Sequence, residues 1–513
     1  MRDYREALSR IRPSTRRHET NMRRLYREMM ANPFMAHTMD PASRENIDGN
    51  KKTRIPDYEH VRVPFFCITE LYTPVTAEGL INGASKLLEN SYRMSSSEKQ
   101  DVMRWLYACR RQESVTRAQP SRRTLPPVVR VDPAKEQPNS RMTTPIWFHH
   151  KYIHDDIPEG IEQVDIEMHA LTTTITTITA AFYLNEDRSS GLEEVVNRDV
   201  TTKLTPVPVE GGSYQGAVTT VSALKRQAAD VWRERMSSDG AQWLAKWLPG
   251  SFHRETHGRL PTIELLLTEQ QRPWAKPSKD RNEDRDWQFI LNLSEYEVYW
   301  QSDSNCLRLH EHSYDRGRNL LTFGALRSEF FSQPSTGFGD GRGFAYFVQP
   351  LASCWALTAF LRDQRERLAN IRDLTDRASR RHSPRALTRV EREMVLMGLE
   401  SDIVTADIVD SAKRENSWRN FPDFADAKCD INADEVIFKT SLVEYLRRGQ
   451  SDLGDKVMRE ESVMRDLLNA GAQLLASAEN LRLQRRVLFL TIVSLIVAVV
   501  AAVAAVAALH IRF

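Results

Sequence analysis

Histidines and carboxylates that could bind a metal are densest between His149 and Asp156. Neutral imidazole and carboxylate groups suit zinc and similar ions, which need three or four converging ligands. His150 and His154 would share one face of a helix, but Pro158 and the aromatic residues before the run favour extended chain. We therefore interpret the run as a surface loop, with a metal site as the alternative.

Two further histidine pairs have spacings that occur in metal sites. His253 and His257 stand at i and i+4, but Glu255 lies midway, so the segment is not the HExxH motif of metalloproteases. His310 and His312 share one face of a predicted strand, for which we expect a solvated strand edge rather than a ligand pair. The sequence thus predicts no metal ligand and no cofactor-binding residue.

A glycine-rich segment from Gly337 to Gly343 lacks the Gly-Lys-Ser/Thr ending of a phosphate-binding loop. Its continuation, from Arg342 to Gln349, approaches the RNP1 pattern of RNA-binding domains. It departs from that pattern at Phe347 and at Gln349, where a base-stacking aromatic is needed. We interpret the segment as a flexible turn. Because the formal net charge is only +2, we expect no nucleic-acid partner.

Nucleophilic catalysis has no recognisable signature in the chain. No serine, cysteine or carboxylate stands in the context of a nucleophile elbow, a triad or an acid–base pair, so the sequence predicts no catalytic residue and favours a non-enzymatic protein. The cysteines include no CxxC pair, which is typical of reduced thiols in a cytosolic domain. They are Cys67, Cys109, Cys306, Cys354 and Cys429.

The stretch from Val487 to Leu509 carries no charge, and its only polar side chains are Thr491 and Ser494. A bilayer core of ~30 Å needs about 20 apolar residues in a helix, so this stretch is long enough to cross. Both hydroxyls can bond to the carbonyl one turn back, which permits insertion. The alternative is a buried core helix, but uninterrupted apolarity of this length favours a single transmembrane helix.

Arginines flank this span unequally. Arg482, Arg485 and Arg486 precede it, whereas Arg512 alone follows in the short tail of residues 510–513. We interpret the first three as membrane-interface anchors, and the positive-inside rule then places the N-terminal bulk in the cytoplasm. The N-terminus has no apolar centre of a secretory signal peptide. We expect a single-pass membrane protein whose first partner is the lipid bilayer.

Composition indicates folded domains before the span. The 513 residues are 41% hydrophobic and 27% charged, and the 10 Trp, 14 Tyr and 19 Phe need a core, which excludes wholesale disorder. We predict a basic, flexible segment at 1–55, an α+β cytosolic domain at 56–350 with a proline-rich loop at 117–145, a helical stalk at 351–486 and a span at 487–509. The stalk would consist of long antiparallel helices.

The strongest β signal runs from Ile161 to Asn185. Val164, Ile166 and Met168 alternate with acidic residues, which predicts an inward face and a wet face. The wet face would carry Glu162, Asp165 and Glu167. Other predicted strands are 60–72, with an edge or break at Pro64, and 128–131, 261–268, 287–293, 296–300, 306–310 and 320–323. Predicted helices include 76–109 and 218–248, the latter broken near Asp239.

The predicted stalk carries an apolar stripe in steps of three and four residues, which is typical of a packed helical seam. We interpret the stripe as core packing against the preceding helices, with self-association as the alternative. Alanines four apart inside the span would let membrane helices approach closely. The stripe is Met464, Leu467, Gly471, Leu474, Ala478 and Leu481.

A segment from Asn480 to Arg486 ends this helix with an asparagine and basic residues just before the span. In this feature, and in its order of cytosolic domain, long helices and span, the region 350–509 distantly resembles the CorA magnesium-channel superfamily. The resemblance implies a related architecture. CorA-type channels have two spans and a Gly-Met-Asn signature, whereas this chain has one span and no such signature, so the resemblance does not imply transport.

These observations predict a C-terminally membrane-anchored cytosolic interaction or sensing protein. It would self-associate or dock an unidentified protein partner at the membrane. One alternative is a divergent CorA-like divalent-cation transporter assembled from single-span subunits. The other is a membrane-anchored enzyme without a recognisable motif.

Overall fold

The computed structural model of the chain describes residues 43–89, 100, 129–133, 151–155, 157–172, 174–208, 214–255, 260–275, 286–294, 299–302, 307–311, 319–332, 342–380, 384–414, 424–431, 434–438 and 440–510. The chain divides into two compact units. One comprises Met1–Phe360 with Ser411–Gly449, and the other Leu361–Asp410 with Gln450–Phe513.

The first unit contains an eleven-stranded mixed sheet with the order β13-β12-β9-β10-β11-β8-β1-β5-β4-β2-β3. Neighbours pair antiparallel except β11 with β8 and β2 with β3. The strands are β1 (Val61–Tyr72), β2 (Val129–Pro133), β3 (Lys151–Asp155), β4 (Ile161–Ala170), β5 (Thr176–Leu184), β8 (Thr262–Thr268), β9 (Tyr299–Ser302), β10 (Arg308–Glu311), β11 (Leu320–Leu326), β12 (Phe424–Ile431) and β13 (Asp434–Phe438). A separate hairpin pairs β6 (Lys203–Pro208) with β7 (Tyr214–Thr219).

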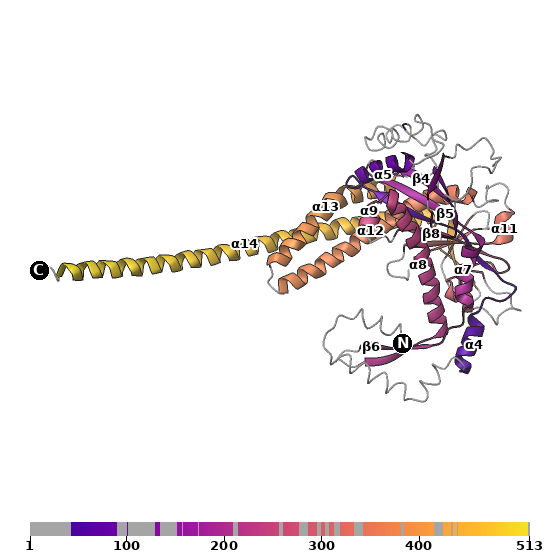
Figure 1. The fold of residues 1–513 in the computed structure, drawn as a ribbon, viewed down its shortest axis with the longest axis horizontal. Helices are drawn as coiled ribbons and strands as arrows, with labels where there is room; N and C mark the ends of the chain where they lie inside the picture. Colours follow the sequence, from indigo (N-terminus) through magenta and orange to yellow (C-terminus); the bar gives the residue numbers. More distant parts are fainter. Residues whose placement is uncertain are drawn as a thin grey trace. The chain divides into compact units, whose positions relative to one another are not determined.

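Helices connect and cover these strands, which confirms the predicted α+β region (Figure 1). The helices are α4 (Arg44–Thr53), α5 (Ala77–Glu89), α7 (Glu186–Asn197), α8 (Val221–Trp247), α9 (Ser251–Glu255), α10 (Asp286–Ile290), α11 (Arg327–Phe331), α12 (Arg342–Arg380), α13 (Pro384–Lys413) and α14 (Leu442–His510). Side-chain caps begin several of them: the Thr220 hydroxyl accepts the Ala223 N–H at the start of α8.

One face of the sheet packs against α8. The rings of Phe66 on β1 and Phe182 on β5 stack at 4.7 Å, and Trp243 of α8 meets Phe182 edge-on. A side chain at Gly240 would bring its Cβ within 3.1 Å of the Phe66 ring, so glycine allows the helix to approach this closely. The predicted break near Asp239 is therefore wrong: the helix continues through the glycine.

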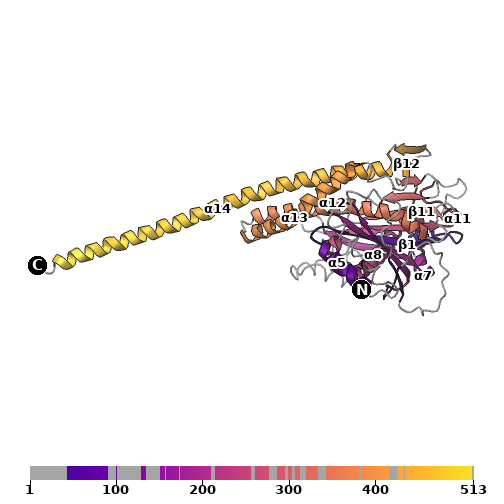
Figure 2. The same cartoon turned by 90° about the horizontal axis from the view of Figure 1, so that it is seen from above.

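The opposite face of the sheet packs against the first part of α12. Phe344 meets Phe65 at 5.3 Å and Phe323 at 5.2 Å, both edge-on. Leu351 and Trp355 extend the same buried cluster along the helix. Because neighbouring residues of a strand point to opposite faces, Phe65 and Phe66 separate the α12 face from the α8 face (Figure 2).

The second unit is formed by the later parts of α12, α13 and α14. Its core joins apolar residues of all three helices. Arg465 of α14 lies 2.6 Å from Asp402 of α13, and it also pairs with Glu461 one turn away. The core residues are Leu368, Ile371, Val390, Met394, Met397, Val457, Met464 and Leu468.

Some predicted elements differ from the structure. Pro64 lies at a register shift of β1, as predicted for a break, but β1 is an interior strand between β5 and β8 rather than an edge. The segment predicted as a strand at 287–293 begins as α10. The predicted helical stalk contains the hairpin β12–β13, which joins the sheet through β9.

Two predictions concern segments that are only partly described. Within the segment predicted to be flexible, 1–55, Ser43 caps α4, and residues 1–42 lie outside the described residues. Asn46 and Asn50 of α4 bind the backbone of Thr202 and Val200, so this helix is fixed to the domain. Within the proline-rich loop, 117–145, only β2 is described, and it lies between β4 and β3.

Candidate functional site

A polar cluster lies on the α12 face of the sheet, where β4, β5 and β1 meet. Asp165, Glu167 and His169 alternate along β4, so they share one face. The register places them opposite Ala181, Thr179 and Thr177 of β5. Asp165 is only 1% exposed and Glu167 only 5%. The predicted wet face of β4 is therefore wrong for these two carboxylates.

Asp165 is held by neutral donors. The Gln163 amide donates to its Oδ1 at 2.9 Å, and the Tyr183 hydroxyl lies 3.3 Å from its Oδ2. Arg130 of β2 occupies the register position opposite Asp165. The two hydrogen bonds fix the Asp165 carboxylate at the Tyr183 side of the cluster.

Hydroxyl groups of β1, β5 and α12 lie beside these β4 residues. Thr69 of β1 and Thr179 of β5 lie side by side, with their hydroxyl oxygens 3.1 Å apart. The Thr177 hydroxyl donates to the Ser353 hydroxyl of α12 at 3.0 Å, which fixes the helix to this part of the sheet. The cluster thus offers oxygen and nitrogen atoms from three strands and one helix.

Glu167 and His169 form the ion pair of the cluster. His169 Nε2 lies 3.3 Å from Glu167 Oε1, and the imidazole side chain is 19% exposed. Glu167 Oε2 has no hydrogen-bond partner, and neither does His169 Nε2. Both groups therefore retain hydrogen-bonding capacity beyond their mutual ion pair.

The α8 face carries a buried charge pair of a different kind. Arg233 of α8 donates from Nε to Glu264 Oε1 at 2.9 Å and to Oε2 at 3.1 Å. The Thr322 hydroxyl of β11 adds a third hydrogen bond to Glu264 at 2.7 Å. Both carboxylate oxygens of Glu264 therefore have hydrogen-bond donors within the chain.

Another buried carboxylate, Glu70 of β1, lies at the start of α9. It accepts the N–H groups of Phe252 at 2.8 Å and His253 at 3.1 Å. Burial is the dominant effect and raises the pKa of Glu70 to about 7, although these backbone donors act in the opposite direction.

The histidine groups singled out from the sequence do not assemble a site in the described residues. His149, His150 and Asp156 lie outside them, and the intervening residues form β3, an edge strand of the sheet. For these residues the strand replaces the expected loop, and it agrees with the extended chain that we favoured over a helix. His253 is exposed on α9, and its partner His257 is not described.

His310 is buried rather than solvated. Its strand, β10, pairs with β9 on one side and β11 on the other, so the expected strand edge is wrong. The imidazole packs on Trp274, with ring centres 5.8 Å apart. His312 and the glycines from 337 to 341 lie outside the described residues.

The segment that approaches RNP1, from Arg342, forms the start of α12. RNP1 aromatics stack on bases from a strand, whereas the residues from Arg342 are helical, so this part of the segment is neither an RNP1 strand nor the flexible turn that we expected.

Thiol chemistry is also disfavoured where the structure describes cysteines. Cys67 and Cys354 are free and buried. Burial raises the pKa of Cys67, and it raises the pKa of Cys354 to about 12, so both remain protonated thiols at neutral pH.

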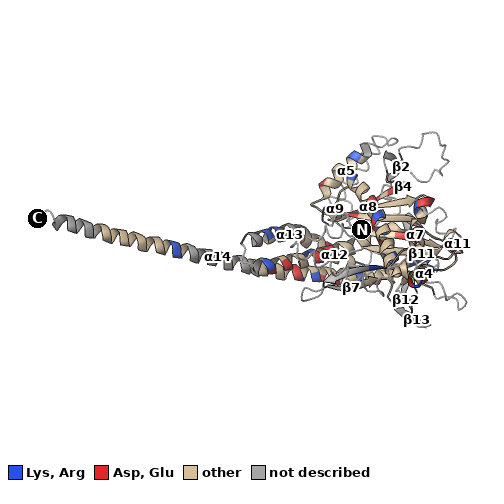
Figure 3. Cartoon of the chain, turned by 60° about the horizontal axis from the view of Figure 1, so that its bottom comes forward, with Lys and Arg blue, Asp and Glu red and all other residues tan. Residues whose placement is uncertain are grey.

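The C-terminal part of α14 contains one segment, Leu483–Ala501, that is long and apolar enough to span a membrane. No part of it is buried within the chain. It overlaps the predicted span from Val487; the side chains beyond Ala501, including Leu509, are not described. Arg485 and Arg486 are exposed on this helix, whereas the side chain of Arg482 is not described. No charged residue follows the two arginines in the described part of the segment (Figure 3).

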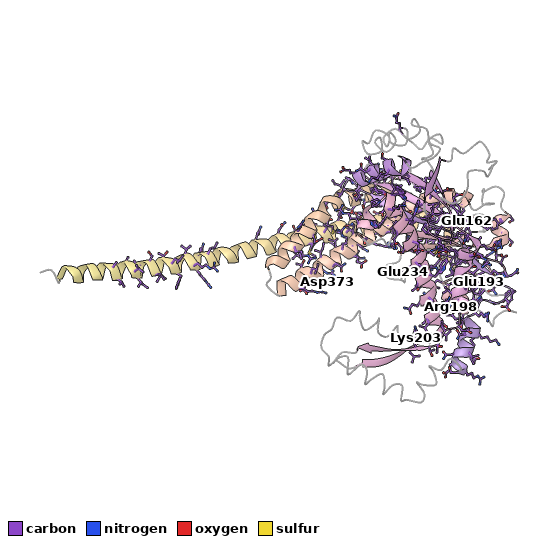
Figure 4. The ribbon with its side chains drawn as sticks, viewed as in Figure 1. Glu162, Glu193, Arg198, Lys203, Glu234 and Asp373 are labelled. Atoms are coloured by element: carbon purple, nitrogen blue, oxygen red, sulfur yellow. The ribbon has the colours of Figure 1, made fainter. Side chains whose placement is uncertain are left out.

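The sequence contains a signal for the β4 cluster that our reading missed. Glu167 and His169 have the same i, i+2 spacing on a strand that drew attention to His310 and His312. The signal was passed over because the acidic face was assigned to solvent. That assignment holds for Glu162, which is exposed (Figure 4).

Comparisons with known proteins add no relative: the chain matches no family model, no curated protein and no solved structure.

Proposed function

We propose that this chain is a membrane-anchored interaction or sensing protein, whose α+β domain is attached to the bilayer through α14. The observation that carries the proposal is the exposed, apolar segment Leu483–Ala501. Inserting an apolar segment of this length into a bilayer removes its side chains from water, which lowers the free energy. The same segment exposed to water does not gain this stabilisation. The same helix begins in the folded domain and therefore links the two physically.

The helices of the second unit form the connection, and we propose that they run antiparallel. A side chain at Gly398 of α13 would meet Glu461 and Arg465, whereas one at Gly454 of α14 would meet Val409. As the chain advances along α13, its neighbours on α14 therefore move back. This arrangement supports a stalk of the predicted kind.

The orientation we propose places the folded domain in the cytoplasm. Arg485 and Arg486 are exposed at the domain side of the apolar segment, where they would contact anionic lipid headgroups. Fusing a protease-sensitive reporter to the C-terminus tests this orientation. We expect the reporter to be protected in sealed inside-out vesicles, whose cytoplasmic face points outward, and digestion of the reporter in them contradicts the orientation.

Membrane attachment is tested by removing residues 483–513. We expect the full chain to sediment with carbonate-washed membranes and the shortened chain to remain in the supernatant. A matched control replaces residues 487–501 with an all-leucine segment of equal length, which should restore sedimentation. Recovery of the full chain in the supernatant without detergent contradicts the proposal.

Self-association through α14 is part of the same proposal. Leu467 belongs to the predicted seam, but it is 58% exposed, and Val463 one turn before it is 60% exposed. Neither is needed by the core of the second unit, so an apolar stripe remains for a second copy of the chain. We expect Leu467→Lys to reduce the native mass in detergent, whereas Asp466→Lys, at an exposed neighbouring position, should not. A monomeric wild-type chain contradicts this part of the proposal.

A further inference from the structure

Leucines recur every seven residues along α14, from the second unit into the apolar segment. The repeat consists of Leu467, Leu474, Leu481, Leu488 and Leu495. Leu467, Leu488 and Leu495 are exposed, and the side chains of the other two are not described. Seven residues make almost two full turns of an α-helix, and α14 is one continuous helix, so the five positions lie along one side of it.

The residues between the leucines complete a heptad pattern. Ala470, Ser477, Gln484 and Thr491 each follow a leucine by three residues, and Val463 precedes the first leucine by four. Alternating steps of three and four are the spacing of the contact positions in a coiled coil. None of these positions is charged, although arginine, aspartate and glutamate residues stand between them. We call the leucines and these five residues together the leucine stripe.

The leucine stripe is separate from the side of α14 that packs within the second unit. Val457, Met464 and Leu468 belong to the core of that unit. By helical geometry they point roughly a third of a turn away from Val463 and Leu467, which are exposed. Met464, which the predicted seam included, therefore stabilises a single chain. The stripe beside it has no such role in the described residues.

We propose that the leucine stripe pairs with the same stripe of a second copy of the chain, in a parallel and in-register arrangement that continues into the bilayer. This inference rests on the proposed membrane anchor. Chains that are anchored in one bilayer with one orientation have parallel α14 helices, with equal residues at equal depth. Each leucine then faces the same leucine of the second copy, and the strict repeat of seven gives the pair a left-handed supercoil.

The chemistry along the stripe suits this register. In water, pairing removes the exposed side chains of Val463 and Leu467 from solvent. Gln484 is exposed directly before the uncharged part of the apolar segment, and two opposed glutamines can hydrogen-bond to each other. A polar residue at a contact position fixes the register of a coiled coil. Farther along, the Thr491 hydroxyl already donates to the Val487 carbonyl at 2.8 Å, so it requires no partner in the second copy.

Cysteine cross-linking of the full chain in membranes tests the arrangement. Ala470→Cys and Gln484→Cys place thiols at two stripe positions, and a disulfide forms only where two Cβ atoms come within ~4.5 Å. After mild oxidation we expect a covalent dimer from each variant, several-fold above the wild-type chain, whose five native cysteines give the background. An antiparallel pair could join two copies of at most one of these positions, so dimers from both establish the parallel register.

Matched controls lie one residue before each stripe position. Asn469→Cys and Leu483→Cys are equally exposed to solvent or lipid but stand beside the stripe, and they should stay at the wild-type background. Adding Leu467→Lys to Ala470→Cys should abolish its dimer, because two ammonium groups would then oppose each other. A dimer from fewer than both stripe positions, or an equal dimer from the controls, overturns the proposal.

The stripe and the proposed function fail in distinguishable ways. A chain that stays in the supernatant overturns the anchor, and the in-register pairing with it. A chain that sediments with membranes but has a monomeric native mass overturns self-association and the stripe, and leaves the anchor. A chain with an oligomeric native mass that cross-links no better on the stripe than beside it overturns the stripe alone.

Discussion

The two faces of the eleven-stranded sheet treat buried carboxylates differently. On the α8 face, the two oxygens of Glu264 share the Arg233 Nε–H, and one of them also accepts from the Thr322 hydroxyl. On the α12 face, Glu167 has one imidazole neighbour and an oxygen without a hydrogen-bond partner. The first carboxylate is fully paired within the chain, and the second is not. The comparison indicates that Glu264 contributes an ion pair to the packing of α8, although Arg233 Nη1 beside it has no hydrogen-bond partner, whereas Glu167 keeps a carboxylate oxygen without one.

The largest effect is expected from breaking the pair on the α8 face. Arg233→Met leaves Glu264 buried without its cation, and we expect the free energy of unfolding to fall by ~3–5 kcal/mol. Urea denaturation of the full chain in detergent measures this loss.

Arg235→Met, an exposed arginine on the same helix, is the matched control and should change stability by less than about 0.5 kcal/mol. By contrast, Glu167→Gln should not destabilise the protein, because one oxygen of the Glu167 carboxylate has no hydrogen-bond partner in the folded chain. A loss at Glu167 as large as that at Arg233 would falsify the distinction between the faces.

A second effect concerns pH and again the α8 face, on which Glu70 lies. Burial raises the folded-state pKa of Glu70 to about 7 from 4.5, so the folded chain holds this proton more tightly than the unfolded chain. The contribution of Glu70 is therefore most favourable below pH 4.5. It declines as the pH rises to 7, by about 3 kcal/mol in total.

Replacing Glu70 with Gln should remove this part of the pH dependence. The measurement is the difference in unfolding free energy between wild type and Glu70→Gln, followed across that pH range. Glu78→Gln, at an exposed position of α5, provides the control. Asp363 has a pKa raised to about 6 by burial, and it contributes to both proteins alike. Equal slopes in wild type and Glu70→Gln contradict the assignment.

The fold was largely accessible from the sequence, because its elements depend on local patterns. Val164, Ile166 and Met168 alternate, and the strand they predict is β4. What the pattern could not show was how many layers cover the strand. An alternating strand looks half-exposed, yet Asp165 and Glu167 of β4 are buried on the face where α12 bonds to the neighbouring strand β5, far away in sequence. The site was missed for that reason.

One glycine and one hairpin were also misjudged from the sequence, because their surroundings in the fold could not be seen there. Gly240 suggested a helix end, since glycine is a poor helix former. In the folded chain it is where α8 approaches Phe66 and Phe182, and only the packing of the two elements reveals this. The hairpin β12–β13 was missed in a region with long helices on both sides, because its pairing partner β9 lies more than a hundred residues earlier.

The smallest effects come from single hydroxyls, and they give the finest comparison of the two faces. Thr322 donates to Glu264, the ion-pair partner of Arg233, whereas Thr69 and Thr179 bond to each other as neutral groups. Hydrogen bonds to charged groups contribute ~1.5–3 kcal/mol and neutral ones ~0.5–1.5 kcal/mol, so Thr322→Val should destabilise the chain more than Thr69→Val. Both losses are measured by urea denaturation. The double variant Thr69→Val with Thr179→Val should cost less than the sum of its single changes, because no hydroxyl is then left unpaired. Equal losses for Thr322→Val and Thr69→Val would contradict the expected difference between a hydrogen bond to an ion-paired carboxylate and one between two hydroxyls.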